Sequence, residues 1–148
     1  MQLEDLYKET LVKHYKARHG YGVLEAYTQS AFRTNHACGD EIRVFVDTSD
    51  AVIRQLSYEL SGCTMCQSSA SIMYDLCVRQ TISHALFLRD AVKKMLVDKQ
   101  CSQREILKDA AAFETVSNFP GRIRCVCLCW DALAEAVNAD DARSTKND

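Results

Sequence analysis

The chain opens with apolar side chains that recur every three or four residues, the spacing of one face of an α-helix. Glu and Lys side chains lie between them, and two glycines, Gly20 and Gly22, end the pattern. The sequence therefore predicts an amphipathic helix that ends near Gly20. Residues 23–36 have no sustained period and are predicted to be mainly a connection, with some strand. The apolar positions of the helix are Leu3, Leu6, Tyr7, Leu11 and Tyr15.

Between residues 41 and 60 the period changes to two, which is typical of half-buried β-strands. In residues 41–47 the apolar side chains Ile42, Val44 and Val46 share one face. A second alternating run ends with Leu56, Tyr58 and Leu60. A turn is expected at residues 48–50, so the two runs should form an antiparallel hairpin.

Helical spacing returns immediately after Cys63 and predicts a helix to about residue 78. A half-buried strand is expected to end at Gly62, so Cys63 lies where free backbone N–H groups and the helix dipole favour a negative sulfur. The small side chains of residues 68–71 would let the first turns of this helix lie close to another backbone. A further helix, capped by Thr81 or Ser83, should extend through Leu96.

The last third of the chain predicts two more helices. Ser102 and Glu105 have the spacing of a capping box, which predicts a short helix over residues 103–114, and Pro120 closes that segment. Residues 123–129 suit a strand by residue type, but apolar steps of four and three residues favour a final helix to about residue 137. These steps join Cys125, Cys129, Leu133 and Ala136.

A chain of 148 residues is expected to form one domain, over residues 1–137. Residues 138–148 are polar and are predicted to be a disordered tail. The order of elements predicts an α+β fold, in which a small antiparallel sheet of about three strands packs against about five helices.

Composition narrows the possible partners. The formal net charge is −2 and no basic stripe is present, which argues against nucleic acid and anionic membrane as partners. No run approaches the roughly 18 apolar residues of a membrane span, and residues 1–5 do not resemble a basic signal peptide start. We therefore expect a cytoplasmic protein.

Eight cysteines demand an explanation in a chain of this length. Disulfides are disfavoured without a secretory signal, which leaves metal binding, sulfur chemistry or small buried core residues. Three segments are candidates for one site: the Cys38-Gly39-Asp40 loop, Cys63 and Cys125. Three thiolates and one carboxylate suit a tetrahedral zinc ion, and Gly39 would let both flanking side chains face it. The spacing by itself leaves buried structural thiols as the alternative.

Three ordered segments carry a family resemblance: residues 35–40 (NHACGD), residues 62–71 (GCTMCQSSAS) and residues 119–125 (FPGRIRC). They resemble the three motifs of the U-type iron–sulfur cluster assembly proteins, and the resemblance extends from Leu3 to Val137. It implies a SufE/NifU-like fold. Two features are similar to the SufU branch rather than the IscU branch: a long insertion between Cys63 and Cys125, and Arg124 where IscU-type scaffolds have histidine.

The resemblance implies that zinc is bound by Cys38, Asp40, Cys63 and Cys125. It further implies that Cys38 accepts sulfane sulfur from a SufS-type cysteine desulfurase, with Arg122 in a supporting position. A histidine of the desulfurase would replace Cys38 on the metal. Such a protein is a persulfide relay rather than an independent enzyme.

An alternative function within the same family is a scaffold that assembles a [2Fe–2S] cluster and passes it to downstream iron–sulfur assembly proteins, with iron in place of zinc. A third alternative is a zinc-stabilised domain without sulfur transfer.

The chain also departs from the family pattern. His36 replaces a proline and is expected to be a solvated loop histidine rather than a competing ligand or a proton shuttle. Cys66 creates a Cys-x-x-Cys spacing with Cys63 that is capable of redox chemistry or of alternative metal ligation, but a core or half-buried thiol is the favoured interpretation. Cys127 and Cys129 replace small polar residues and are expected to serve helix packing. Cys77 is expected to be structural and Cys101 to be exposed.

Overall fold

The alternating runs of the sequence form two neighbouring strands of an antiparallel sheet. The computed structural model describes the backbone of residues 2–146 and the side chains of residues 2–138. In it, β2 (Asp40–Ser49) pairs with β3 (Val52–Ser61). The predicted inner face is confirmed, because Val44 lies opposite Tyr58 and all the predicted inward positions are buried.

A full strand occupies part of the segment that was expected to be mainly a connection. β1 (Gln29–Asn35) pairs with β2 and completes a sheet of order β1-β2-β3. The hydrophobic pattern does not reveal it, since its one large apolar side chain, Phe32, is 47% exposed. Backbone pairing with β2 and packing of α5 along β1 hold this edge strand in place, with the small side chain of Ala31 in the core.

The turn between β2 and β3 lies slightly later than predicted. Asp50 and Ala51 form it, and both have positive φ, at 53° and 60°. Two consecutive residues in this conformation make the tight turn that matches the twist of a β-hairpin. β2 therefore extends to Ser49 rather than ending at residue 47.

The first three predicted helices are present. α1 spans Leu3–Ala17, α2 spans Thr64–Cys77 and α3 spans Ile82–Asp98. Of the two predicted caps for α3, Thr81 is the one used, because its hydroxyl accepts the backbone N–H of His84 at 3.1 Å.

The fourth helical segment differs in detail from its prediction. α4 (Arg104–Leu107) is a single turn that continues into the 3-10 helix η1 (Lys108–Val116). The capping-box prediction was wrong: Gln103 occupies the N-cap position and no side chain caps the helix. A left-handed φ of 50° at Lys108 separates the two pieces, so one continuous α-helix does not form.

The last helix is confirmed and is longer than predicted. α5 spans Pro120–Lys146, so Pro120 begins this helix, the position where a proline loses no helical hydrogen bond. The backbone of α5 crosses the predicted tail. Side chains beyond Asn138 and residues 147–148 lie outside the described residues, and disorder of residues 138–148 stays a prediction.

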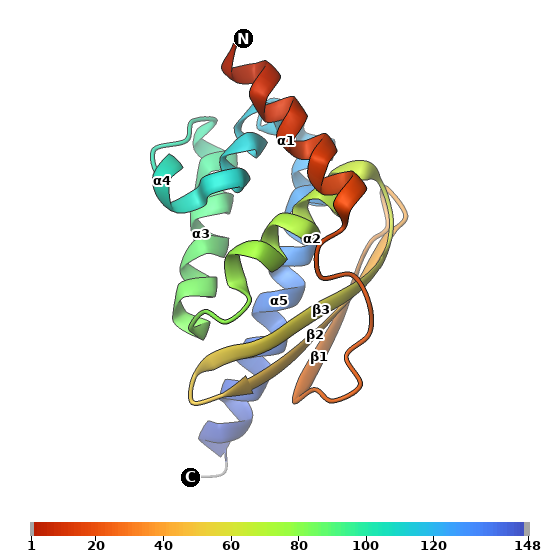
Figure 1. Ribbon diagram of the computed structural model, residues 1–148, viewed down its shortest axis with the longest axis vertical. Helices are drawn as coiled ribbons and strands as arrows, with labels where there is room; N and C mark the ends of the chain where they lie inside the picture. Colours follow the sequence, from red (N-terminus) through yellow and green to blue (C-terminus); the bar gives the residue numbers. More distant parts are fainter. Residues whose placement is uncertain (1, 147–148) are drawn as a thin grey trace.

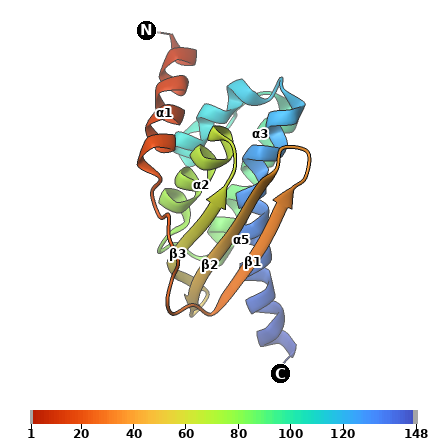
Figure 2. The ribbon, with the colours of Figure 1, turned by 90° about the vertical axis from the view of Figure 1, so that its right-hand side faces the viewer.

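The helices cover one face of the sheet. α5 runs along β1 and β2, and α2 packs beside it against β3 (Figures 1 and 2). α3 and η1 contact α5 and α2, and α1 packs on α2 and η1. The opposite face of the sheet is partly covered by the segment before β1, where the ring of Tyr27 lies 5.1 Å from that of Phe45.

The small side chains of α2 bring this helix close to its neighbours, as predicted. The Ser68 hydroxyl donates to the carbonyl of Leu11 in α1, and the Ser69 hydroxyl donates to that of Val126 in α5, each at 2.7 Å. Both hydroxyls are buried and hydrogen-bonded, so the close approach leaves no unpaired polar group at these positions.

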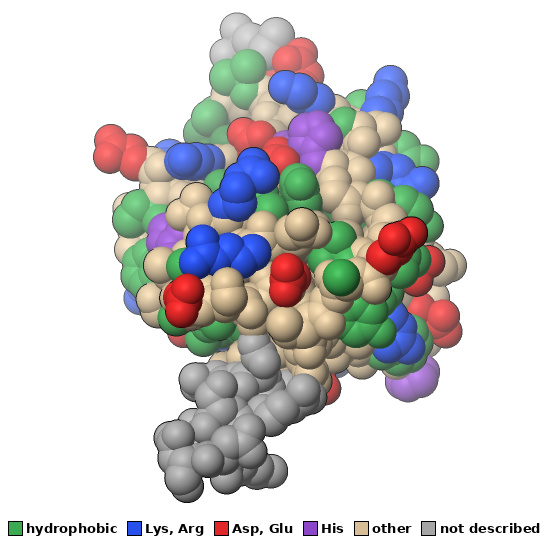
Figure 3. All heavy atoms as spheres, turned by 60° about the horizontal axis from the view of Figure 1, so that its bottom comes forward, with side chains coloured by type: hydrophobic (Ala, Val, Ile, Leu, Met, Phe, Trp, Pro, Cys, Tyr) green, Lys and Arg blue, Asp and Glu red, His purple; other side chains and the backbone are tan. Residues whose placement is uncertain are grey.

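No helix in the described part of the chain is both long enough and apolar enough to cross a membrane. On the face shown in Figure 3, basic and acidic side chains lie interspersed over the described residues.

Phe113 provides a test of this core, because its ring is fully buried in η1 whereas Phe87 of α3 is 45% exposed. Phe113→Ala should lower the free energy of unfolding by about 3–5 kcal/mol, since it leaves a cavity. Phe87→Ala should lower it by less than about 1 kcal/mol. Urea denaturation measures both values, and equal losses would contradict this packing.

Candidate metal centre

The turn between β1 and β2 presents the first candidate cysteine. Residues 36–39 form the turn, and the backbone N–H groups of Cys38 and Gly39 both donate to the Asn35 carbonyl, at 3.2 and 2.8 Å. Gly39 has a φ of 75°, which favours glycine. Cys38 is exposed at the tip of this hairpin, while Asp40, two residues later, is fully buried as the first residue of β2.

The second candidate lies at the predicted junction of strand and helix. β3 ends at Ser61, and Cys63 is the N-cap residue of α2. Its sulfur accepts the backbone N–H of Cys66 at 3.4 Å, so the free N–H groups of the helix start do face this sulfur. Cys125, the third candidate, lies in the second turn of α5 and is fully buried.

These side chains come together at one end of the sheet. The Cys38 and Cys125 sulfurs are 3.5 Å apart, and both lie within 4.8 Å of a carboxylate oxygen of Asp40. The Cys63 sulfur is 3.9 Å from Asp40 Oδ2. Two sulfurs bound to one zinc ion at about 2.3 Å lie roughly 3.8 Å apart in tetrahedral geometry, which is close to the Cys38–Cys125 separation. The Cys63 sulfur approaches Asp40 but does not belong to the group of three ligand atoms that all lie within 4.8 Å of one another.

Asp40 is the central member of this group. Its side chain is 0% exposed, and among the described residues no Lys, Arg or His side chain forms an ion pair with it. Oδ1 accepts the Cys63 backbone N–H at 2.9 Å, while Oδ2 faces the Cys63 sulfur. A buried carboxylate is costly unless it is protonated, paired or bound to a cation, and a cation held by the surrounding sulfurs would satisfy it.

Burial and close neighbours both affect the pKa of the Cys125 thiol. Burial raises the pKa of this thiol, and the neighbouring Asp40, Cys38 and Cys63 side chains raise it further. Asn35 donates from Nδ2 to the Cys125 sulfur at 3.8 Å. Sequence analysis did not single out Asn35, although it is the first residue of one of the three motifs.

The donor set fits zinc, and its thiols also suit an iron–sulfur cluster. Three sulfurs with one oxygen satisfy tetrahedral coordination, and their unequal burial leaves the Cys38 side exposed. Cys38 is therefore the donor that another molecule can reach.

Arg122 has different surroundings from the four clustered side chains. It is exposed on α5, three residues before Cys125, and it lines a surface groove with Phe119 and Met65. None of the described residues forms a hydrogen bond or ion pair with its guanidinium.

The remaining cysteines lie outside this cluster of four. Cys66, Cys77 and Cys129 are fully buried, and burial raises the pKa of each thiol. Cys101 is only 7% exposed, so the prediction that it is exposed was wrong: its segment folds back until its N–H donates to Glu114. Cys127 is half-buried, and burial raises its pKa to about 11.

Two histidines, His36 and His14, differ in their exposure. His36 is exposed in the β1–β2 turn, and its Nε2 lies 3.1 Å from the Thr34 hydroxyl. His14 lies on α1 and is 2% exposed, because α1 packs against α2 and η1. A single histidine in an amphipathic pattern gives no sign of such burial.

Gly62 offers a test of how closely Asp40 is confined. A Cβ atom at Gly62 would lie 2.6 Å from Asp40 Oδ1, whereas one at Gly121 would meet nothing within 4 Å. Gly62→Ala should therefore lower the free energy of unfolding by about 1–3 kcal/mol, because the buried carboxylate must move. Gly121→Ala, in the first turn of α5, should be neutral or stabilising. Urea unfolding of metal-free protein makes the comparison, and a neutral Gly62→Ala would contradict the confinement.

This chain is similar to known proteins over most of its length. Residues 6–126 match the model of the NifU-like N terminal domain. The chain is 30% identical over 139 residues to the zinc-dependent sulfurtransferase SufU of Bacillus subtilis, covering 94% of each chain. It is also 30% identical over 136 residues to the iron–sulfur cluster assembly scaffold protein IscU of Streptococcus pyogenes, covering 92% of this chain and 85% of that one.

The fold is likewise known from solved structures. A putative iron–sulfur cluster assembly scaffold protein for the SUF system from Fervidobacterium islandicum has a TM-score of 0.82 at 24% identity, over 91% of this chain and 98% of that one. That similarity confirms the predicted α+β fold. The matched family model covers the three motifs from Asn35 to Cys125, and the chain therefore belongs to the NifU-like N-terminal domain family.

Proposed function

We propose that this protein accepts sulfane sulfur from a SufS-type cysteine desulfurase during iron–sulfur cluster assembly. Cys38 is the acceptor, and a zinc ion is held by Cys38, Asp40, Cys63 and Cys125. One observation carries the proposal: the buried Asp40 carboxylate has three cysteine sulfurs around it and no cationic side chain among the described residues. The zinc-dependent sulfurtransferase named among the relatives supports it.

Bound zinc would keep the three sulfurs as thiolates and restrain their nucleophilicity. The fold buries the four proposed ligands to different extents. Cys125 and Asp40 are buried in α5 and β2, and Cys63 is fixed by the start of α2, whereas Cys38 lies on an exposed four-residue turn. Cys38 is thus the ligand that can leave the site with the least disturbance of packing.

Sulfur transfer then follows ordinary thiol–disulfide exchange. The Cys38 thiolate attacks the terminal sulfur of the desulfurase persulfide, and a new S–S bond forms on Cys38. The S–S bond of the desulfurase breaks, and its cysteine leaves as a thiolate. Cys38 carries the persulfide, with no net oxidation or reduction.

Arg122 is proposed to support this transfer. Its exposed guanidinium projects from the same helix as Cys125, beside a groove formed with Phe119 and Met65. A cation at this position would attract an anionic persulfide or the approaching partner.

The second candidate is a scaffold that builds a [2Fe–2S] cluster and passes it to downstream assembly proteins. The relative named as an assembly scaffold supports it, as does the set of three thiols with one oxygen ligand. Both candidates need reduced thiols, which suits the proposed cytoplasmic location.

Metal analysis separates the two candidates. Purified protein should be colourless and contain one zinc ion per chain, and Asp40→Asn should weaken zinc binding by more than about tenfold, because it removes one ligand charge. Competition with a coloured chelator measures that affinity. Brown protein with visible sulfur-to-iron absorption would instead support the scaffold.

Cys38→Ala tests the acceptor. The variant should lose stimulation of a SufS-type desulfurase, returning turnover to the basal rate, while it still binds the desulfurase in a pull-down. Cys127→Ser is a matched control, because Cys127 is a half-buried thiol outside the cluster and its loss should leave stimulation unchanged. Retained stimulation in Cys38→Ala would contradict the assignment.

A further inference from the structure

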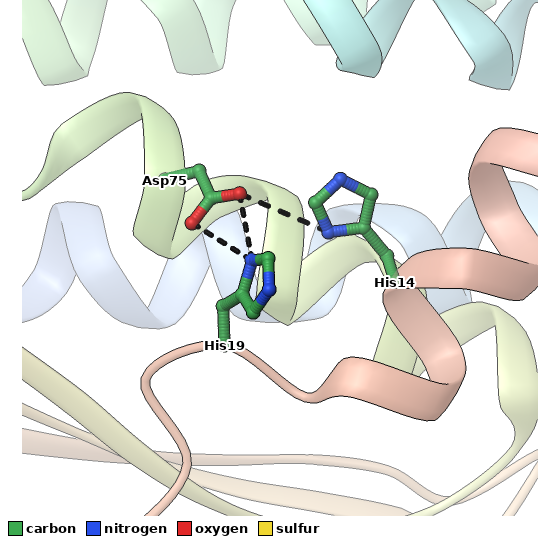
Figure 4. A group of neighbouring side chains, drawn as sticks. All are labelled: His14, His19 and Asp75. Atoms are coloured by element: carbon green, nitrogen blue, oxygen red, sulfur yellow. Dashed lines mark hydrogen bonds and ion pairs between the residues drawn. The ribbon is translucent and has the colours of Figure 1, made fainter.

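A second group of metal-ligating side chains lies away from the cysteines. His14 is in the last turn of α1, His19 follows that helix, and Asp75 is in the last turn of α2 (Figure 4). Asp75 is twelve residues beyond Cys63, which is about 18 Å along the axis of α2. The two clusters therefore occupy opposite ends of the same helix.

The three ligand atoms converge. Nδ1 of His19 lies 2.9 Å from Asp75 Oδ2, and Nδ1 of His14 lies 4.0 Å from the same oxygen. All three atoms are within 4.8 Å of one another. Donor atoms bound at about 2.1 Å to one ion lie roughly 3.0–3.4 Å apart in octahedral or tetrahedral geometry, so small side-chain movements suffice to bind one.

The surroundings of His14 fix which ring nitrogen is free to bind. Nε2 lies 2.8 Å from the carboxylate of Asp109, an acceptor only, so this nitrogen carries the proton. In the neutral ring Nδ1 then has the lone pair and accepts from the Ser71 hydroxyl, which lies 2.8 Å away. A histidine that donates its other N–H to a carboxylate is the arrangement found around most metal-binding histidines.

Ser71 links the two histidines, and its hydroxyl occupies the side of His14 Nδ1 on which an ion would bind. Its oxygen also accepts the backbone N–H of His19 at 3.0 Å, which holds His19 next to His14. Binding of an ion by His14 therefore requires the Ser71 side chain to turn away from Nδ1, and a helical serine can then donate to the carbonyl four residues earlier.

The group is open to solvent on one side. His14 is 2% exposed, whereas His19 is 42% and Asp75 40% exposed. An ion could enter past the two exposed ligands and meet one rigid, buried imidazole. The two nearby carboxylates, Asp75 and Asp109, favour a cation here.

We propose that His14 Nδ1, His19 Nδ1 and an Asp75 oxygen bind a divalent first-row transition metal ion, with water completing its coordination. Two imidazoles and one carboxylate with open positions form a donor set suited to zinc and ferrous ions. This site differs from the cysteine cluster in ligand chemistry and does not depend on the proposed sulfur transfer.

Cobalt(II) tests the proposal because its spectrum reports the ligands. Cobalt bound by thiolates gives sulfur-to-metal charge-transfer absorption in the near ultraviolet, and cobalt bound by imidazole and carboxylate does not. Metal-free full-length protein, titrated anaerobically and analysed by equilibrium dialysis, should bind one cobalt ion without this absorption. That ion is counted separately from any bound by the cysteines.

His19→Ala and Asp75→Asn should each weaken binding of this ion by more than about tenfold while leaving thiolate absorption unchanged. They are preferred over His14 variants, because His14 is buried and its loss endangers folding. His84→Ala, on α3, is the matched histidine control and should change nothing. Binding of thiolate-ligated cobalt alone, or a non-thiolate ion retained in both variants, would overturn the proposal and leave His19 and Asp75 as an ion pair only.

Discussion

A buried carboxylate with no cationic side chain beside it is the feature on which the candidate site depends. Asp40 is the first residue of β2, and its oxygens face the start of α2. Gly62 is the residue that permits this contact, because a Cβ there would collide with the carboxylate. The Cys63 backbone N–H donates to one of the two oxygens, and the Cys63 sulfur lies 3.9 Å from the other as its hydrogen-bond donor. A cation held by the surrounding sulfurs would balance the charge of this buried carboxylate.

The architecture supplies these ligands from rigid elements of different kinds. A hairpin turn presents Cys38, a helix N-terminus presents Cys63, and the second turn of α5 presents Cys125. Packing of α5 along β1 and β2 brings the last of these to the others, although it is 87 residues from Cys38 in sequence. Because the three sulfurs differ in burial, Cys38 is the one that another molecule can reach.

α2 is the element that connects the two metal-ligating clusters. Cys63 caps its beginning, and Asp75 lies in its last turn beside His14 and His19. Between these two ends of α2, the small side chains of Ser68 and Ser69 donate to backbone carbonyls of α1 and α5. This small-residue surface lets two helices pack closely, so the histidine group and the cysteine group are held by the same packed unit.

The sequence by itself determined the helices with a clear apolar period, the β2–β3 hairpin and the position of Cys63 at a helix start, since these depend on local periodicity and capping. Its three motifs also indicated the four side chains of the candidate site, which are Cys38, Asp40, Cys63 and Cys125. Only the tertiary structure decided that β1 is a strand, that Cys101 and His14 are buried, and that Asp40 lies against Gly62. Each of these depends on contacts between distant segments, and no local pattern records which face another segment will cover.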